Sequence, residues 1–189
     1  KIQKAGRHLD GQGYASVQLA GAGWDMESQW AFYQGFNSTM SDNTVAWNET
    51  DEGVASQLDD MRAANQFTRE LVNLSAEEIY PLSLAERVSE HLKSIAPENV
   101  IYTVGRASQH APVLAVIDYN PTGDEDAPVD YALVGKGITY DSGGYSIKPS
   151  EGMLSMKCDM GGAATLAGAL STAIRRGLNK RVKLFLCCA

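Results

Sequence analysis

The spacing of apolar and polar residues predicts short elements in the first part of the chain. Residues 1–36 contain a helical pattern, the apolar stretch YASVQLAG that is typical of a strand, and a second helical pattern that is rich in aromatic residues. The glycine-containing segments DGQG and GAG separate these elements. The polar stretch NSTMSDNT (37–44) predicts a loop, and we expect a domain boundary between residues 37 and 53.

Three longer segments have the three-to-four-residue spacing of amphipathic helices. The first includes residues 54–71, where every third or fourth residue is apolar, and its length suits a helix that links two domains. The second begins at Pro81 and ends before Pro97, because proline is tolerated in the first turn of a helix and not in its interior. The third covers residues 161–177, with one small and apolar face and Gly177 as its C-terminal cap.

Short apolar runs alternate with these helices. Three of them predict buried strands: PVLAVIDY (112–119), YALVGKG (131–137) and VKLFLCC (182–188). Strands that alternate with helices predict the α/β class, with a mixed, mostly parallel sheet flanked by helices. We expect three parts: the remainder of a smaller N-terminal α/β domain (1–52), a linker helix (53–75) and a larger α/β domain (76–189).

The composition narrows the classes of protein. The hydrophobic share of 44% and the charged share of 21% are typical of a globular protein. The net charge of -7 disfavours nucleic acid as a partner, because nucleic-acid binders usually present a basic face. No apolar run reaches the roughly 20 residues that span a bilayer. The three cysteines form no disulfide framework and favour a reducing cytoplasm. Because the chain begins at Lys1 and ends in the apolar run RVKLFLCCA, we expect it to be a fragment.

Charged residues gather in one glycine-rich segment, VGKGITYDSGGYSIKPSEGMLSMKCDMGG (134–162). Lys136, Asp141, Lys148 and Asp159 lie there among seven glycines. A phosphate-binding loop is one interpretation, but such loops place the lysine after the glycine-rich turn and before Ser or Thr, whereas Lys136 lies between two glycines. A second interpretation is that the residues are simply solvated, with Asp141 shaping a turn and Asp159 capping a helix.

A metal site is the third interpretation, and the four residues taken together favour it. Lys136 ends an apolar strand, and ligands bind at the carboxyl ends of strands in open α/β sheets. Partial desolvation there is expected to lower the pKa of the amine and free its lone pair for a metal. Asp141 and Asp159 supply oxygen ligands that suit Zn²⁺ or Mn²⁺, and Asp141, in a tight turn, can bridge two ions. The paired glycines let the backbone approach the ions, and Lys148 is left to polarise a substrate carbonyl.

The stretches VGKGITYDSGGYSIKP and MKCDMGGAAT closely resemble the signature of the leucine aminopeptidase family of dinuclear metallo-exopeptidases. Within that family, YSIKPSEGM is most similar to the peptidase B branch. The charged residues occur in a fixed order at offsets of five, seven and eleven. Weaker similarity extends over residues 21–36, 68–86 and 103–123. The resemblance implies a metallo-aminopeptidase that hydrolyses the N-terminal bond of short peptides with two divalent ions, Mn²⁺ or Zn²⁺.

Position by position, the resemblance implies that Lys136 and Asp159 bind the more exchangeable metal and that Asp141 is shared by both ions. Lys148 becomes the catalytic lysine, which binds the scissile carbonyl oxygen. Met156 matches a residue that lines the pocket for the substrate's first side chain, with a plain core methionine as the alternative. The family's second signature, Asn-Thr-Asp-Ala-Glu-Gly-Arg, does not occur in these 189 residues, so we expect the isolated chain to be nearly inactive.

Further expectations concern partners and single residues. The resemblance implies a homohexamer; the alternatives are a non-catalytic oligomer scaffold of the same fold and a DNA-binding accessory protein, which the acidic charge disfavours. In PENVIYTVGRAS (97–108) a helix passes directly into a strand, where the family usually inserts a further helical connection. We expect Cys158 to pack as a small apolar residue rather than to bind a metal or act as a redox switch. At most one of Cys187 and Cys188 is expected to face the core, since neighbours in a strand alternate between faces.

Overall fold

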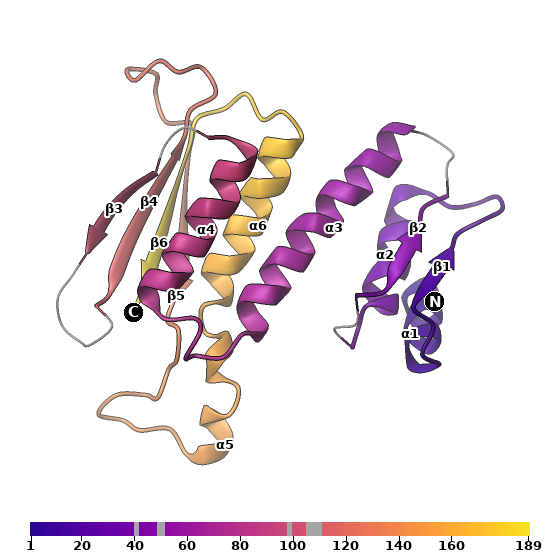
Figure 1. The fold of residues 1–189 in the computed structure, drawn as a ribbon, viewed down its shortest axis with the longest axis horizontal. Helices are drawn as coiled ribbons and strands as arrows, with labels where there is room; N and C mark the ends of the chain where they lie inside the picture. Colours follow the sequence, from indigo (N-terminus) through magenta and orange to yellow (C-terminus); the bar gives the residue numbers. More distant parts are fainter. Residues whose placement is uncertain (40–41, 49–51, 98–99, 105–110) are drawn as a thin grey trace. The chain divides into compact units, whose positions relative to one another are not determined.

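The computed structural model describes residues 1–39, 42–48, 52–97, 100–104 and 111–189 (Figure 1). The chain divides into two compact units, Lys1–Met61 and Arg62–Ala189, and each is described by itself. In the junction 97–108, where the family usually inserts a helical connection, residues 98–99 and 105–108 lie outside the described residues. No helix in the described ranges has both the length and the apolar character that crossing a membrane requires.

The N-terminal unit packs two helices and a small sheet around an aromatic core. Its elements are α1 (Ile2–Gly11), β1 (Ser16–Gln18), α2 (Met26–Phe36), β2 (Thr44–Ala46) and the first part of α3 (Glu52–Asn73). Strands β1 and β2 pair in parallel. The core residues are Leu19, Phe32, Tyr33, Phe36, Val45, Trp47 and Leu58. The predicted helix, strand and helix are confirmed, whereas β2 begins at the end of the predicted loop, because three residues are too few to show a strand period.

The C-terminal unit contains a four-stranded sheet in the order β3-β4-β6-β5. After α3, its elements are α4 (Pro81–Ile95), β3 (Val100–Val104), β4 (Val113–Tyr119), β5 (Tyr131–Gly137), α5 (Ser150–Met153), the 3-10 helix η1 (Met156–Cys158), α6 (Gly161–Arg175) and β6 (Val182–Cys188). The three longer helices and the three strands predicted from the sequence are present, so the α/β class is confirmed. Gly177 follows α6 with a φ of 73°, the left-handed conformation that ends helices.

The sheet is mixed, as expected, but it has fewer parallel pairings than the sequence analysis predicts. Strand β6 pairs in parallel with β5 and antiparallel with β4, and β3 pairs antiparallel with β4. The parallel pair is joined through α6, which returns the chain to the same end of the sheet. The connection from β4 to β5 contains no helix and reverses the chain direction instead. Alternation of helices and strands in the sequence does not reveal this difference.

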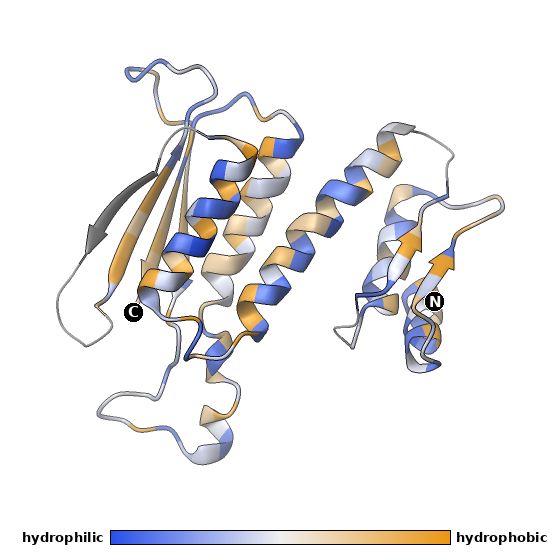
Figure 2. Cartoon of the chain, in the orientation of Figure 1, coloured by the Kyte–Doolittle hydropathy of each residue, from blue (hydrophilic) through white to orange (hydrophobic). Residues whose placement is uncertain are grey.

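Helices α4 and α6 cover one face of the sheet (Figure 1). Apolar residues of α6 and of the strands line this contact, while the outer side of α4 is polar (Figure 2). Alternate residues of β6 face the helices and are buried: Val182, Leu184, Leu186 and Cys188. On the opposite face, Phe185 is half-buried and Cys187 is exposed. The helix-covered face therefore supplies the core of this unit.

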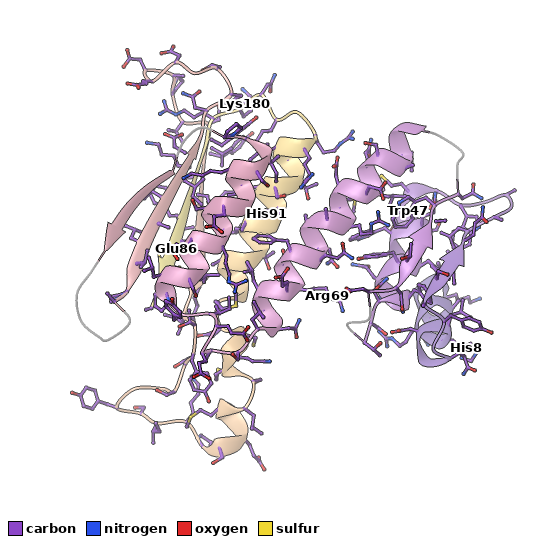
Figure 3. All side chains as sticks on the ribbon, in the orientation of Figure 1. His8, Trp47, Arg69, Glu86, His91 and Lys180 are labelled. Carbon is purple, nitrogen blue, oxygen red and sulfur yellow. The ribbon has the colours of Figure 1, made fainter. Side chains whose placement is uncertain are left out.

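Two sets of contacts stabilise the C-terminal unit. His91 of α4 stacks on Phe67 of α3 with ring centroids 3.7 Å apart, and its Nε2 lies 3.0 Å from Ser171 Oγ of α6 (Figure 3). Burial lowers the pKa of His91, so the neutral ring is favoured at this helix junction. At one end of the sheet, near Lys180 in Figure 3, the Arg181 guanidinium donates to both carboxylate oxygens of Asp118 over 3.1 and 2.8 Å.

Candidate metal centre

Lys136 and Asp159 meet where β5 ends and α6 begins, and we call them the framework pair. Lys136 is the next-to-last residue of β5, as the sequence predicts. Asp159 directly follows η1, two residues before the first residue of α6. The Nζ atom of Lys136 lies 2.9 Å from Asp159 Oδ2. The structure thus brings together two residues that are far apart in the sequence.

Glycines, which have no side chain, allow β5 and α6 to approach closely at this point. A Cβ on Gly135 would lie 2.7 Å from the Cα of Ala163 in α6, closer than real Cβ contacts. A Cβ on Gly162 would lie 3.3 Å from the backbone nitrogen of Lys136. Glycines therefore let the first turn of α6 rest against the end of β5. This contact sets the distance between Lys136 and Asp159.

Asp159 carries a carboxylate oxygen that solvent does not reach. Its Oδ2 accepts no hydrogen bond with suitable geometry from any described residue, although the charge of Lys136 lies 2.9 Å away. The helix-capping interpretation of Asp159 is wrong, because the N-cap of α6 is Met160 and no side chain caps this helix. A buried carboxylate oxygen is costly without a partner, and the ammonium of Lys136, 2.9 Å away, is the partner of this one.

Lys136 differs from the sequence prediction in its exposure and its charge. Its side chain is 59% exposed, so the expected desolvation is slight. The pKa of Lys136 is raised, first by Asp159 and to a smaller extent by Asp141. The predicted lowering of this pKa is therefore wrong, because nearby carboxylates favour the charged amine more than burial disfavours it.

Asp141 and Lys148 close a loop after β5, and we call them the loop pair. The Lys148 Nζ donates to Asp141 Oδ2, while Asp141 Oδ1 accepts a 2.8 Å bond from the Gly143 backbone. These two bonds, that from Lys148 first, lower the pKa of Asp141. Asp141 does shape a turn, as the solvated interpretation holds. A Cβ on Gly143 would lie 2.4 Å from Ser146 O, so the backbone of the same loop leaves no room for a side chain at this position.

Thr139 ties the segment between the two pairs to the end of β6. Its backbone nitrogen and its Oγ1 donate to the carbonyl oxygen of Ala189 over 2.9 and 3.0 Å. In return, the Ala189 nitrogen donates to Gly137 O over 3.1 Å. Thr139 is 7% exposed, so these bonds are largely shielded from water. The sequence analysis missed this residue, since a single threonine after a strand carries no pattern.

The remaining predicted residues lie close to this region. Met156 is half-buried in η1, and its carbonyl accepts a 3.3 Å bond from the backbone nitrogen of Asp159. Cys158 is exposed, so the expectation that it packs as an apolar residue is wrong: its 3-10 turn faces solvent. The alternation of Cys187 and Cys188 is confirmed, with Cys187 exposed and Cys188 buried. Burial raises the pKa of Cys188 to about 12, which keeps this thiol unreactive at neutral pH.

The donor set suits a divalent cation in its chemistry. Lys136 and Asp159 form one ion pair near the end of β5, Asp141 and Lys148 form another in the loop that follows, and such oxygen and nitrogen ligands are those of Zn²⁺ and Mn²⁺. The buried Oδ2 of Asp159 is the clearest sign, because it already pairs with a positive charge, the ammonium of Lys136. Among the residues that the structure describes, no three His, Cys, Asp or Glu side chains form a metal-binding group.

Comparisons with known proteins agree with the motifs. A family model described as "Cytosol aminopeptidase family, catalytic domain" matches residues 66–189, and one described as "Peptidase" matches residues 1–51. Peptidase B of Vibrio atlanticus is 49% identical over the whole chain, and peptidase B of Vibrio parahaemolyticus is 48% identical. The chain spans 48% of the length of each of these curated relatives.

Solved structures share the fold. The cytosol aminopeptidase from Coxiella burnetii superposes with a TM-score of 0.76 at 25% identity, covering 99% of this chain and 46% of that one. The bottromycin maturation enzyme BotP in complex with Mn superposes with a TM-score of 0.74 at 26% identity, covering 100% of this chain and 47% of that one. The resemblance drawn from the sequence motifs is confirmed, and the chain belongs to the cytosol aminopeptidase family.

Proposed function

We propose that the protein is a metal-dependent aminopeptidase that releases N-terminal residues from short peptides. The observation that supports this most directly is the framework pair, in which the buried Oδ2 of Asp159 lies 2.9 Å from Lys136 Nζ. Family membership and the names of the relatives support the same activity. Because the chain spans 48% of those relatives, the activity is proposed for the whole protein.

In this proposal Lys136, Asp141 and Asp159 hold two divalent ions, Mn²⁺ or Zn²⁺, with Asp141 shared between them. The complex of BotP with Mn supports manganese. When bound, divalent ions polarise carbonyl groups and lower the pKa of water to about 7, which makes hydroxide available at neutral pH. The raised pKa of Lys136 means that its Nζ must lose a proton before it can act as a ligand.

Lys148 and Met156 act on the substrate in this proposal. Lys148, as an ammonium, donates a hydrogen bond to the carbonyl oxygen of the scissile bond and stabilises the negative charge that develops there. Met156 contacts the first side chain of the peptide, and its half-buried position beside Asp159 agrees with this role. A flexible thioether side chain adapts to apolar groups of different shapes.

The surroundings of the site suit a small cationic substrate. The net charge of -7 attracts the protonated N-terminus of a peptide and disfavours nucleic acid. We also propose a homohexamer and a cytoplasmic location, which the relationship to cytosol aminopeptidases supports. The domain division at 1–52, 53–75 and 76–189 is part of the same proposal, with the last range as the N-terminal part of the catalytic domain.

Hydrolysis of Leu-p-nitroanilide by the full-length protein tests the function. We expect turnover with Mn²⁺, loss of turnover with EDTA, and no release from N-acetyl-Leu-p-nitroanilide, which lacks the free amine. Asp159→Asn should lower kcat/KM by at least about 100-fold, because it removes a ligand. Asp126→Asn, in the exposed loop after β4, is the matched control and should retain activity. Turnover that persists in EDTA and in Asp159→Asn would contradict the proposal.

A further inference from the structure

The loop that follows β5 uses both carboxylate oxygens of Asp141 for its own closure. Oδ1 accepts the Gly143 backbone nitrogen over 2.8 Å, and Oδ2 accepts Lys148 Nζ. The side chains of Asp141 and Lys148 are 31% and 29% exposed, so the contact is largely covered by protein. A cation that approaches Oδ2 therefore meets the positive charge of the lysine ammonium at the same oxygen.

The backbone of the loop holds Lys148 in this position. Its nitrogen donates to Ser142 O over 2.9 Å, and the Ser146 nitrogen donates to Gly143 O over 3.2 Å. Gly143 has a φ of 90°, and a Cβ on it would lie 3.1 Å from Lys148 Cγ. A turn that only glycine adopts readily thus places the backbone of Lys148 close to Asp141.

The same loop has little buried surface to lose if it opens. Tyr145 is fully exposed and Ile147 is 67% exposed, so neither side chain contributes to the core. The segment between β5 and α5 extends away from the sheet (Figure 1). Loops with few buried apolar contacts open at low free-energy cost. Rearrangement of the loop is therefore inexpensive compared with movement of β5 or α6.

We propose that Lys148 and a divalent cation compete for Oδ2 of Asp141, so that cation binding releases Lys148 from its own loop. The inference rests on the proposed function for the role of Asp141 as a ligand. A dication beside Asp141 repels the ammonium of Lys148 and replaces its ion pair. Lys148 becomes available to a substrate carbonyl only when Asp141 is occupied. The loop pair thereby links loading of the site to the availability of the lysine.

The framework pair provides the contrast within the same site. Asp159 Oδ2 is paired with Lys136, which comes from a strand rather than from the loop, and Lys148 takes no part in that pair. Competition with Lys148 is therefore confined to the binding event that depends on Asp141. Removing the charge of Lys148 should raise the affinity for that cation. If Lys148 serves only in catalysis, its removal should leave the cation affinity unchanged.

Isothermal titration of the full-length protein with Mn²⁺ tests the competition without measuring activity. Lys148→Met should bind Mn²⁺ about fivefold more tightly than the wild type, the size expected for loss of a partly exposed competing ion pair. Lys148→Arg keeps the charge and should stay within about twofold of the wild type. The matched control is Lys157→Met, because Lys157 is also a nearby cation but donates to Asn73 O. In Asp141→Asn the effect of Lys148→Met should disappear.

The outcomes separate this inference from the proposed function. If the wild type binds Mn²⁺ and Lys148→Met binds no more tightly than Lys157→Met, competition is overturned and the function stands. If the wild type binds neither Mn²⁺ nor Zn²⁺, both are overturned. Should Lys148→Met lose its folded circular dichroism, reductive methylation of the wild type replaces it: labelling of Lys148 relative to Lys157 should rise about fivefold with Mn²⁺. An unchanged ratio would overturn the competition.

Discussion

The framework pair and the loop pair both join a lysine to an aspartate, but the chain positions them by different means. Lys136 and Asp159 come from separate elements, and the packing of α6 on β5 brings them together. Asp141 and Lys148 lie in one loop, and local hydrogen bonds bring them together. In the framework pair the buried Oδ2 of Asp159 contacts only the lysine of the pair, whereas in the loop pair one carboxylate oxygen of Asp141 accepts from Lys148 and the other from the Gly143 backbone, as far as the described residues show.

This difference indicates which part of the site is preformed. Packed elements hold their side chains within narrow limits, because a core repacks only at a cost of several kcal/mol. A loop with exposed side chains can change its contacts at much lower cost. The framework pair is therefore the rigid part of the site, and the loop pair is the part that can exchange partners.

Gly135→Ala should have the largest effect, since it breaks the framework and spares the loop. The new Cβ would meet the backbone of Ala163 at 2.7 Å, so β5 and α6 must separate. We expect the free energy of unfolding to fall by about 3 kcal/mol, the upper range for overpacking in a core. Urea denaturation measures this. Gly161→Ala is the control, because a Cβ there meets nothing within 4 Å. Equal stability of the two variants would show that the close approach does not fix the framework.

Asp118→Asn provides a comparison with the two pairs of the site, because it weakens an ion pair that is more buried than either of them. The Asp118 and Arg181 side chains are 15% and 14% exposed and share two hydrogen bonds. We expect a loss of about 1.5 kcal/mol near pH 7, because a charge-assisted bond is weakened. Asp126→Asn, in the exposed loop after β4, should lose much less.

The pH dependence of this loss has a definite sign. Arg181 lowers the pKa of Asp118 below its ordinary value of 3.8. A carboxyl with a lowered pKa stabilises the fold above that ordinary value and loses its contribution as the pH falls through the folded pKa. The difference in urea midpoint between wild type and Asp118→Asn should therefore be full at pH 7 and shrink below about pH 4. A difference that does not depend on pH would contradict the assignment to this carboxylate.

The sequence predicted those features that depend on local pattern. Helical spacing and β-branched runs identified the main elements, and the charged motif identified Lys136, Asp141, Lys148 and Asp159. The direction of the Lys136 pKa was not predictable, because it depends on Asp159, which tertiary packing brings to 2.9 Å. Sequence spacing places these two residues in one motif but gives no distance between their charges.

Features that depend on packing partners escaped the sequence analysis for the same reason. The sequence analysis gave no packing role to Gly135, which lies against Ala163 of α6. Thr139 gained its role from Ala189, at the end of β6. In both cases the partner lies in an element that is distant in sequence, so no local period reports it. Roles for the five predicted site residues stay predictions.

Thr139→Val should have a smaller effect, confined to the segment that joins the two pairs. The substitution keeps the shape and removes one of two hydrogen bonds to Ala189 O, while the backbone bond of 2.9 Å remains. We expect a loss of about 1 kcal/mol in the free energy of unfolding, measured by urea denaturation. The control is Thr172→Val, whose hydroxyl donates to Gly168 O within α6. If the Thr139 variant is as stable as this control, the Thr139 hydroxyl does not anchor the segment between the two pairs.

Lys136→Met should have the smallest effect on stability. It tests whether the packing of α6 on β5 positions Lys136 and Asp159, or whether their ion pair holds α6 against β5. The Lys136 side chain is 59% exposed, so solvent screens its attraction to Asp159. We expect the urea midpoint to fall no further than that of Lys180→Met, in low salt and in 1 M NaCl alike. Lys180→Met is the matched control, since Lys180 is 52% exposed and lies 3.1 Å from Asp130. A midpoint that falls for Lys136→Met, but not for Lys180→Met, would mean that the ion pair itself fixes α6 against β5. A fall no larger than that of Lys180→Met means that the glycine contact does so, and that Lys136 is free to exchange its proton for a cation without loosening the fold.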